Sequence, residues 1–247
     1  MSIAARPTEI AAPTKRWSPR RVAGAGVLGC WAAMFWFLLI AGRSNLYLST
    51  RTDWVIPVGA VILSAAFIGR VLSARTVVPE SLDRRESLIL AAMVVPVLVV
   101  MVLPPTALNS FAASRRSAIG GAGFVSSTGD ISHGDLSLVD LAGSTRTVEG
   151  RRALAARAGD TVSFTGFVTR DPGTPADEFT LTRFVVSCCI ADALSVEVHI
   201  VGAPPGAFKN DDWVTATGKV YPLAQETILD ASQIDKVERP KHPYITP

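Results

Sequence analysis

Three long apolar segments occupy the first half of this 247-residue chain. They run over Val22–Gly42, Trp54–Gly69 and Ser87–Leu108, and none of them contains an Asp, Glu, Lys, Arg or His. A helix needs roughly 20 apolar residues to cross a bilayer. The first and third segments reach that length, and the second comes close to it. We therefore expect a membrane protein with three transmembrane helices and a polar C-terminal half that folds in water.

The distribution of basic residues predicts the orientation of these spans. Two arginines, Arg43 and Arg51, lie between the first and second spans, whereas the N-terminal segment and the second connection hold many more: Arg6, Lys15, Arg16, Arg20, Arg21, and Arg70, Arg75, Arg84, Arg85. Basic residues in short loops stay on the cytoplasmic side. We expect the N-terminus in the cytoplasm and, after three crossings, the C-terminal domain outside it, although Arg115 and Arg116 after the third span weigh against this.

Composition divides the chain into four parts. Residues 1–21 form a basic tail, rich in Ala, Pro and Thr at its start, that we expect to be disordered in the cytoplasm. Residues 22–111 hold the three spans, residues 112–158 are a Gly- and Ser-rich linker with one short helix near its end, and residues 159–247 form a β domain. The tail, the spans and their connections (residues 1–111) together hold about 11 basic and 5 acidic residues. Residues 112–247 hold about 13 basic and 16 acidic residues.

The last part has the alternating pattern of short strands. Five are expected, over Thr161–Val168, Phe179–Ile190, Ala193–Val201, Asp212–Val220 and Thr227–Val237. Two of them contain a glycine two residues before their end, at positions 166 and 218, where a strand of a small barrel bends sharply. Five strands in about 80 residues predict an all-β domain of the OB-like barrel kind, with a small sandwich as the alternative.

The same domain argues against two functional classes. Its slightly acidic balance does not fit nucleic-acid binding, and its aromatic residues at strand spacing are better explained as core: Phe164, Phe167, Phe184 and Trp213. No nucleophile and base stand at the spacing of a catalytic triad. We expect neither a nucleic-acid partner nor an enzyme.

A vicinal cysteine pair, Cys188 and Cys189, is the most distinctive local feature of the domain. On a strand, adjacent side chains point to opposite faces. One hypothesis is a thiolate site for a divalent metal such as zinc, completed by Asp192 and His199. The alternative is one packed cysteine and one incidental thiol, because no CxxC or HxxxH pattern supports a metal. Arg183 is expected either at the same binding surface or as an ion-pair partner of Asp192.

These residues belong to a longer set of motifs that resembles the YcgQ-type family of bacterial membrane proteins. The motifs are Leu46-Tyr47-Leu48, Leu103-Pro104-Pro105, Phe111–Arg116, Gly166-Phe167-Val168, Asp171-Pro172, Arg183–Ala193, Trp213-Val214 and Pro240–Ile245. The resemblance implies a permease subunit with a C-terminal domain of unknown function that works with a larger polytopic partner. This chain differs from the family in its longer N-terminal tail and in lacking a His-rich cytoplasmic loop.

Residues and resemblance together predict an accessory subunit of a two-component membrane permease. Spans without ionisable residues do not make a transport pathway by themselves. The exported domain would dock or bind a ligand through Arg183, Cys188, Cys189 and Asp192. The alternative is a membrane-tethered metal- or redox-binding module that uses the two cysteines.

Overall fold

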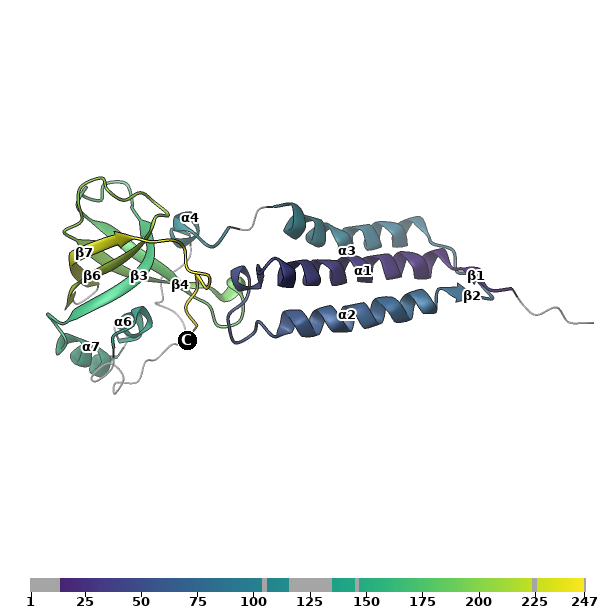
Figure 1. The fold of residues 1–247 in the computed structure, drawn as a ribbon, viewed down its shortest axis with the longest axis horizontal. Helices are drawn as coiled ribbons and strands as arrows, with labels where there is room; N and C mark the ends of the chain where they lie inside the picture. The colour runs from purple at the N-terminus through teal and green to yellow at the C-terminus, as the bar shows by residue number, and fades with distance from the viewer. Residues whose placement is uncertain (1–13, 104–105, 116–134, 145–146, 224–225, 247) are drawn as a thin grey trace, which may run out of the picture. The chain divides into compact units, whose positions relative to one another are not determined.

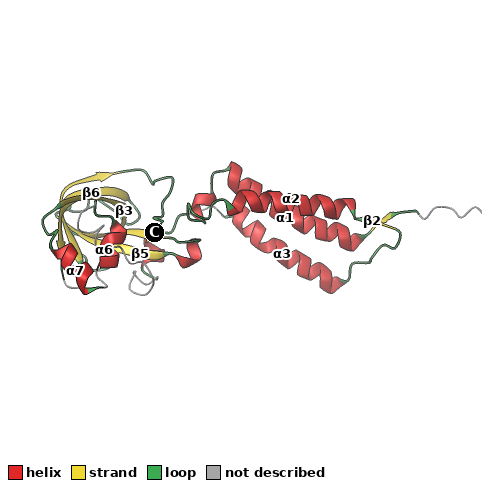
Figure 2. Cartoon of the chain, turned by 90° about the horizontal axis from the view of Figure 1, so that it is seen from below, coloured by secondary structure: helices red, strands yellow, loops and turns green. Residues whose placement is uncertain are grey.

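The computed structural model describes residues 14–103, 106–115, 135–144, 147–223 and 226–246. The chain divides into two compact units. The first holds residues 1–42 and 54–104, and the second holds residues 43–53 and 105–247. The connection between the first two long helices is therefore part of the C-terminal unit. Figures 1 and 2 show the helices of the first unit and the strands of the second.

Among the described residues, three helices are long and apolar enough to cross a membrane: α1 (Pro19–Ile40), α2 (Val55–Leu72) and α3 (Arg84–Val102). This confirms the expected number of spans. Helix α1 packs against both α2 and α3 and lies between them in Figure 1. Two glycines allow close approach: a Cβ at Gly59 would lie 2.5 Å from the Phe35 ring, and one at Gly29 would lie 3.1 Å from the Phe67 ring.

The bounds of two predicted segments differ from the structure. The third span was expected to reach Leu108, but α3 ends at Val102, because the proline pair that follows cannot continue a helix. In the expected disordered tail, residues 1–13 lie outside the described part, while strand β1 (Arg16–Trp17) pairs with β2 (Arg75–Thr76) and α1 already begins at Pro19.

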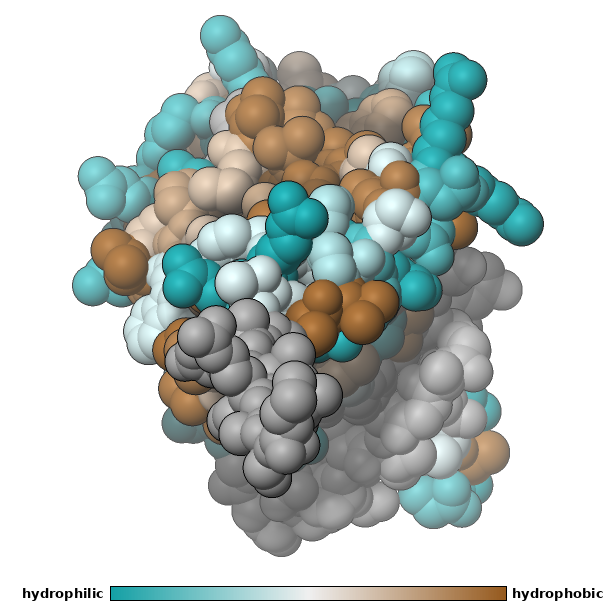
Figure 3. Space-filling model, turned by 90° about the vertical axis from the view of Figure 1, so that its right-hand side faces the viewer, coloured by the Kyte–Doolittle hydropathy of each residue, from teal (hydrophilic) through white to brown (hydrophobic). Residues whose placement is uncertain are grey.

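Ion pairs hold the start of α1 to the connection between α2 and α3 and to the first turn of α3. Glu80 binds Arg21 at 3.1 Å and Arg20 at 3.3 Å, and Glu86 binds Arg20 at 3.1 Å. The hydrogen bond from Arg21, with the nearby positive charges, lowers the pKa of the Glu80 carboxyl despite the desolvation that opposes it. Figure 3 faces this end of the chain and shows hydrophilic side chains beside hydrophobic surface.

The second unit is a closed five-stranded barrel, which confirms the OB-like expectation. Its strands are β3 (Thr161–Thr169), β4 (Phe179–Val185), β5 (Leu194–Val201), β6 (Trp213–Pro222) and β7 (Thr227–Lys236). Their order around the barrel is β3-β4-β5-β7-β6, and only the β5–β7 pairing is parallel. Strand β3 closes the barrel by pairing with β6 and β4 in turn.

Glycines allow two close approaches in this barrel. At Gly166 a Cβ would lie 2.6 Å from the carbonyl oxygen of Thr182. At Gly218, beside a register shift in the β6–β7 pairing, a Cβ would lie 2.1 Å from the carbonyl oxygen of Asp230. Real Cβ atoms do not come this close to backbone, so only glycine fits at both positions.

Of the expected weakly structured linker, residues 116–134 and 145–146 lie outside the described part, and the described residues that follow contribute to the core instead. Helices α6 (Leu138–Ser144) and α7 (Val148–Ala155) pack beside β5 and β6 (Figures 1 and 2). Leu136, Leu141 and Leu154 are buried in the barrel core. The sequence signal was misleading because the Gly- and Ser-rich composition around these helices hid their few leucines.

A second hydrophobic cluster lies apart from the barrel core. Phe167 and Phe184 are at most 2% exposed, but they contact Val186, Ala193 and Tyr244 rather than the barrel core. Helix α4 (Ser110–Ala113), which follows the third span, and the side chains of Leu108 and Trp213 complete this cluster. The prediction that these aromatics are core is confirmed for Phe164 in the barrel core and for Phe167 and Phe184 in the second cluster, whereas Trp213 is only partly buried beside that cluster.

We predict that Gly218→Ala destabilises the barrel by about 1–3 kcal/mol, because the new methyl group forces the backbone of β7 away. Hydrogen exchange of β6 and β7 peptides from the full chain, followed across a urea series, measures the loss. Glu197→Ala, at an exposed position of β5, is the control and leaves exchange unchanged. Equal protection in Gly218→Ala and the native chain would contradict the prediction.

Candidate functional site

Four segments outside the barrel strands meet in the C-terminal unit. The loop over residues 43–53 pairs with the cysteine segment through an isolated bridge between Leu48 and Cys189. The Ile190 amide donates to the Tyr47 carbonyl at 2.9 Å. The Cys188 carbonyl accepts from the Ser49 amide at 3.2 Å and from Oγ1 of Thr52 at 2.6 Å. The connection between α1 and α2 is thus fixed to the end of β4.

Tyr244 lies in the C-terminal segment and joins this segment, and the one that follows α3, to the loop over residues 43–53. Its buried hydroxyl donates to the Leu46 carbonyl at 3.1 Å and accepts from the Leu108 amide at 3.2 Å. The next residue, Ile245, pairs with β4: its amide donates to the Phe184 carbonyl at 2.8 Å, and its carbonyl accepts from the Val186 amide at 2.9 Å. One phenol therefore connects the loop, the exit of the third span and the C-terminus.

Arg183 positions the C-terminal segment and does not pair with Asp192 as predicted. Its guanidinium donates to three backbone carbonyls, those of Pro243 at 3.2 Å, His242 at 3.2 Å and Thr165 at 3.3 Å. It also lies 5.9 Å from the centre of the Trp213 ring. Burial lowers the pKa of Arg183 from its usual value. The pairing was wrong because Asp192 is satisfied within its own turn.

The two cysteines follow β4 rather than lying on it. The strand expected to continue to Ile190 ends at Val185, and the chain then turns through the short helix η2 (Ile190–Asp192). The Cys188 and Cys189 sulfurs lie 3.7 Å apart, so the two thiols do not point to opposite faces as a strand would require. The structure therefore brings together a dithiol with one exposed member, Cys188.

Asp192 closes this turn and keeps the Cys188 thiol protonated. Its carboxylate accepts from the Ser187 amide at 3.1 Å and the Cys188 amide at 2.8 Å. Partial burial opposes ionisation, yet hydrogen bonds from the thiol of Cys188 and from neighbouring amides lower the pKa of Asp192. The hydrogen bond to the Asp192 carboxylate, with that to Cys189, raises the pKa of Cys188 to about 11. The exposed thiol is thus protonated at neutral pH.

The predicted metal ligands do not assemble. His199 lies on β5 opposite Thr180, and its Nε2 contacts Oε2 of Glu178 at 2.9 Å. The cysteines follow Val185, five pairs further along the same ladder, a separation of about 17 Å at the rise of a strand. Within the described ranges, no group of three or more His, Cys, Asp and Glu side chains is arranged to hold a metal ion. Strand register, which the sequence does not display, separates His199 from the pair.

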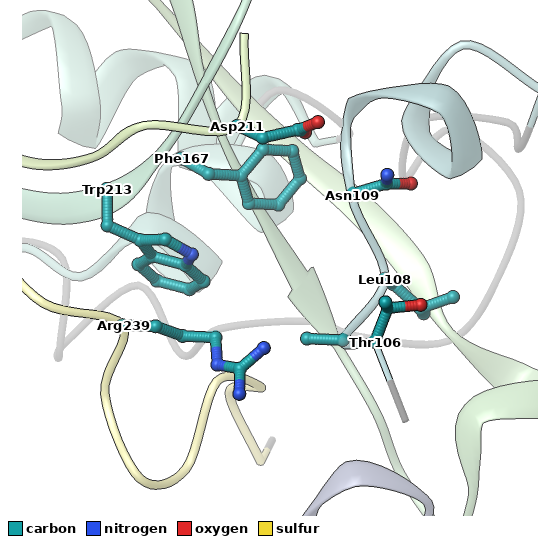
Figure 4. A pocket seen from close by; sticks show the side chains of 8 residues that line it. Thr106, Leu108, Asn109, Phe167, Asp211, Trp213 and Arg239 are labelled. Atoms are coloured by element: carbon teal, nitrogen blue, oxygen red, sulfur yellow. The ribbon is translucent and has the colours of Figure 1, made fainter. Parts of the chain in front are cut away.

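A cavity of about 290 Å³ opens beside the second hydrophobic cluster. Figure 4 shows its walls: the aromatic rings of Phe167 and Trp213, the polar side chains of Thr106, Asn109 and Asp211, and the guanidinium of Arg239. The Phe167 and Trp213 rings lie 5.8 Å apart at 58°. Sequence reasoning found the two aromatics but assigned them to the core, and it did not single out Asp211 or Arg239.

The polar groups of this cavity differ in how they are already bound. Oδ1 of Asp211 accepts from the Ser110 amide at 2.7 Å, and Oδ1 of Asn109 accepts from the Ala112 amide at 3.4 Å. Asp211 has a φ of 71°, in the left-handed region that few residues other than glycine adopt. The Asn210-Asp211-Asp212 run before Trp213 was a turn signal that could have drawn attention to this position.

The described residues define a protein with a closed β-barrel and three helices that can span a membrane. A family model described as the DUF1980 C-terminal domain matches residues 152–247. This range holds the whole barrel, the cysteine pair and the C-terminal segment, and it agrees with the expected domain of unknown function. The YcgQ-type assignment of the whole chain stays a prediction. No curated protein and no solved structure matches this chain.

We predict that Asp192→Asn makes Cys188 more reactive. Without the negative carboxylate, the pKa of the thiol falls toward its ordinary 9.0, so more thiolate is present at pH 8. Alkylation by iodoacetamide, followed by mass spectrometry in a Cys30→Ser, Cys189→Ser background, accelerates on the order of tenfold. Asp177→Asn, outside this turn, is the control and leaves the rate unchanged. An unchanged rate in Asp192→Asn would show that the carboxylate does not govern the thiol.

Proposed function

We propose that this chain is an accessory subunit of a two-component bacterial membrane permease, with its barrel outside the cytoplasm as a docking or ligand-binding domain. The observation that carries the proposal is the exposed apolar surface of α3. Val97 is the only described residue of α3 that is buried, and the exposed apolar side chains include Leu88, Met93 and Leu98. Such a surface must face lipid or the helices of a partner.

The composition of the spans supports a supporting rather than a conducting role. Between Val22 and Ile40, Val55 and Gly69, and Ser87 and Val102, the helices hold no Asp, Glu, Lys, Arg or His. Transport pathways through membranes usually contain such groups to pair with the cargo or to relay protons. The pathway would then belong to the larger polytopic partner.

The contacts of the C-terminal unit support the proposed topology. The loop over residues 43–53 and the barrel form one unit, so both must lie on the same side of the membrane. The start of α1 and the α2–α3 connection meet at the helix ends opposite the loop over residues 43–53. There the Ser18 amide donates to the Ala74 carbonyl. That end holds most of the basic residues near the spans, which favours the cytoplasm. The barrel would then lie outside.

Cysteine labelling tests this topology. Glu197→Cys on β5 and Ser81→Cys between α2 and α3 are each introduced into a chain whose three native cysteines are replaced by serine. We expect a membrane-impermeant maleimide to label Glu197→Cys in intact spheroplasts and to label Ser81→Cys only after lysis. Labelling of Ser81→Cys in intact spheroplasts would reverse the orientation.

Purification from native membranes in mild detergent tests the partnership. We expect a stoichiometric polytopic protein to accompany the tagged chain, and a photo-crosslinking residue at Met93 of α3 to join the two. The same residue at Ile40, exposed at the end of α1, is the control for nonspecific crosslinking. A chain that purifies alone, or that transports solute alone in liposomes, would contradict the accessory role.

A second candidate function, a tethered redox module, is favoured by the 3.7 Å distance between the Cys188 and Cys189 sulfurs. The two thiols would pass two electrons and two protons to a disulfide of a redox partner. A bond would form between Cys188 and Cys189 while the partner's disulfide becomes two thiols. The alkylation assay distinguishes the two functions in protein isolated without reductant. For a redox module, both cysteines resist iodoacetamide until dithiothreitol is added; for a docking domain, they react without it.

A further inference from the structure

The cavity beside the second hydrophobic cluster has the features of a ligand site. Its volume of about 290 Å³ lies at the lower end of the range for small-molecule pockets. An aromatic wall and a few polar groups line it, as Figure 4 shows. We propose that it binds a small organic anion with a flat apolar body, and that Arg239 pairs with the anionic group. This inference does not depend on a permease partner.

The aromatic wall is fixed before any ligand arrives. Phe167 is 2% exposed and stacks on Phe184, with ring centres 5.8 Å apart at 28°. Trp213 packs on Phe167 at the same separation and has the Arg183 guanidinium near its ring. Rings held in place in this way lose little conformational freedom when a flat group packs against them. Trp213, which is only partly buried, is the ring available to a ligand, and it favours a ring or another planar apolar group there.

Arg239 is exposed and supplies a positive charge that, among the described residues, forms no ion pair with the Asp211 carboxylate of the same cavity. Within the described ranges, its guanidinium has no hydrogen bond, ion pair or ring contact, whereas the neighbouring Arg183 donates to three carbonyls. A free guanidinium binds a carboxylate or phosphate through two parallel hydrogen bonds. The availability of donors, rather than the charge alone, makes Arg239 the anion partner.

The other polar groups orient the ligand. The carboxylate of Asp211 repels a second anionic group near it, so the anion of the ligand turns toward Arg239. Oδ1 of Asn109 accepts from the Ala112 amide. The NH2 group of the same side chain is the part that can donate to a ligand. These constraints select a ligand with one anionic end, and they disfavour a dianion that extends across the cavity.

Two sources can provide an anionic group on an apolar body. One is a soluble aromatic carboxylate, and the other is the phosphate of an anionic lipid, because the lining residue Thr106 follows the end of α3 by four residues. Both present an anion on an apolar body. Membranes of defined composition separate them.

The test uses the full chain, labelled with 5-fluorotryptophan, in nanodiscs of phosphatidylcholine. Trp213→Phe assigns the fluorine resonance of Trp213. We expect benzoate to shift this resonance saturably, and its neutral isostere benzamide to bind at least tenfold more weakly. Arg239→Gln reduces the affinity for benzoate at least tenfold without changing that for benzamide. Arg152→Gln, an exposed arginine on α7 outside the cavity, leaves both affinities unchanged.

A second set of nanodiscs contains phosphatidylglycerol. If this lipid shifts the Trp213 resonance or displaces benzoate in an Arg239-dependent manner, the anion that occupies the site is a lipid headgroup. If benzoate binds equally in both membranes, the ligand is soluble. The proposal is overturned if neither anion shifts the resonance saturably, or if Arg239→Gln binds them as tightly as the native chain. An unchanged Trp213 resonance in ligand-free Arg239→Gln shows that the wall is intact.

Discussion

The second hydrophobic cluster is the constraint on which the rest of the C-terminal unit depends. Phe167 and Phe184 are large apolar side chains outside the barrel core, and burying each is worth about 1.5–3 kcal/mol. Their cover comes from Leu108 and α4 after the third span and from Tyr244 near the C-terminus. Tyr244 in turn holds the Leu46 carbonyl of the first connection. The cluster is thus covered by the segment after α3 and by the C-terminal segment, which also binds the first connection.

The sequence predicted the features that follow from local periodicity. Three apolar runs became three helices, and five alternating segments became five strands within a few residues of their expected ends. The mid-strand glycines 166 and 218 are where backbones approach too closely for a side chain. Each of these signals lies within a single segment, so no knowledge of distant contacts was needed to read it.

Apart from the early ends of α3 and β4, the failures concern contacts between distant segments. His199 and the cysteines looked close in sequence, but the ladder of β4 and β5 places them far apart. Arg183 found its partners about 60 residues away, in the C-terminal segment. Leu136 and Leu141 lie in a segment of loop-like composition, yet they complete the barrel core. Register and the choice of covering segment are set by packing of the whole unit, which a single sequence does not reveal.

The cysteine turn and the cavity contact segments that the chain joins to different helices. The Cys188 carbonyl accepts two hydrogen bonds from the loop that joins α1 to α2, at Ser49 and Thr52. The cavity is instead lined by Thr106 and Asn109, which follow α3. Tyr244 links these two segments, because its hydroxyl donates to the Leu46 carbonyl and accepts from the Leu108 amide.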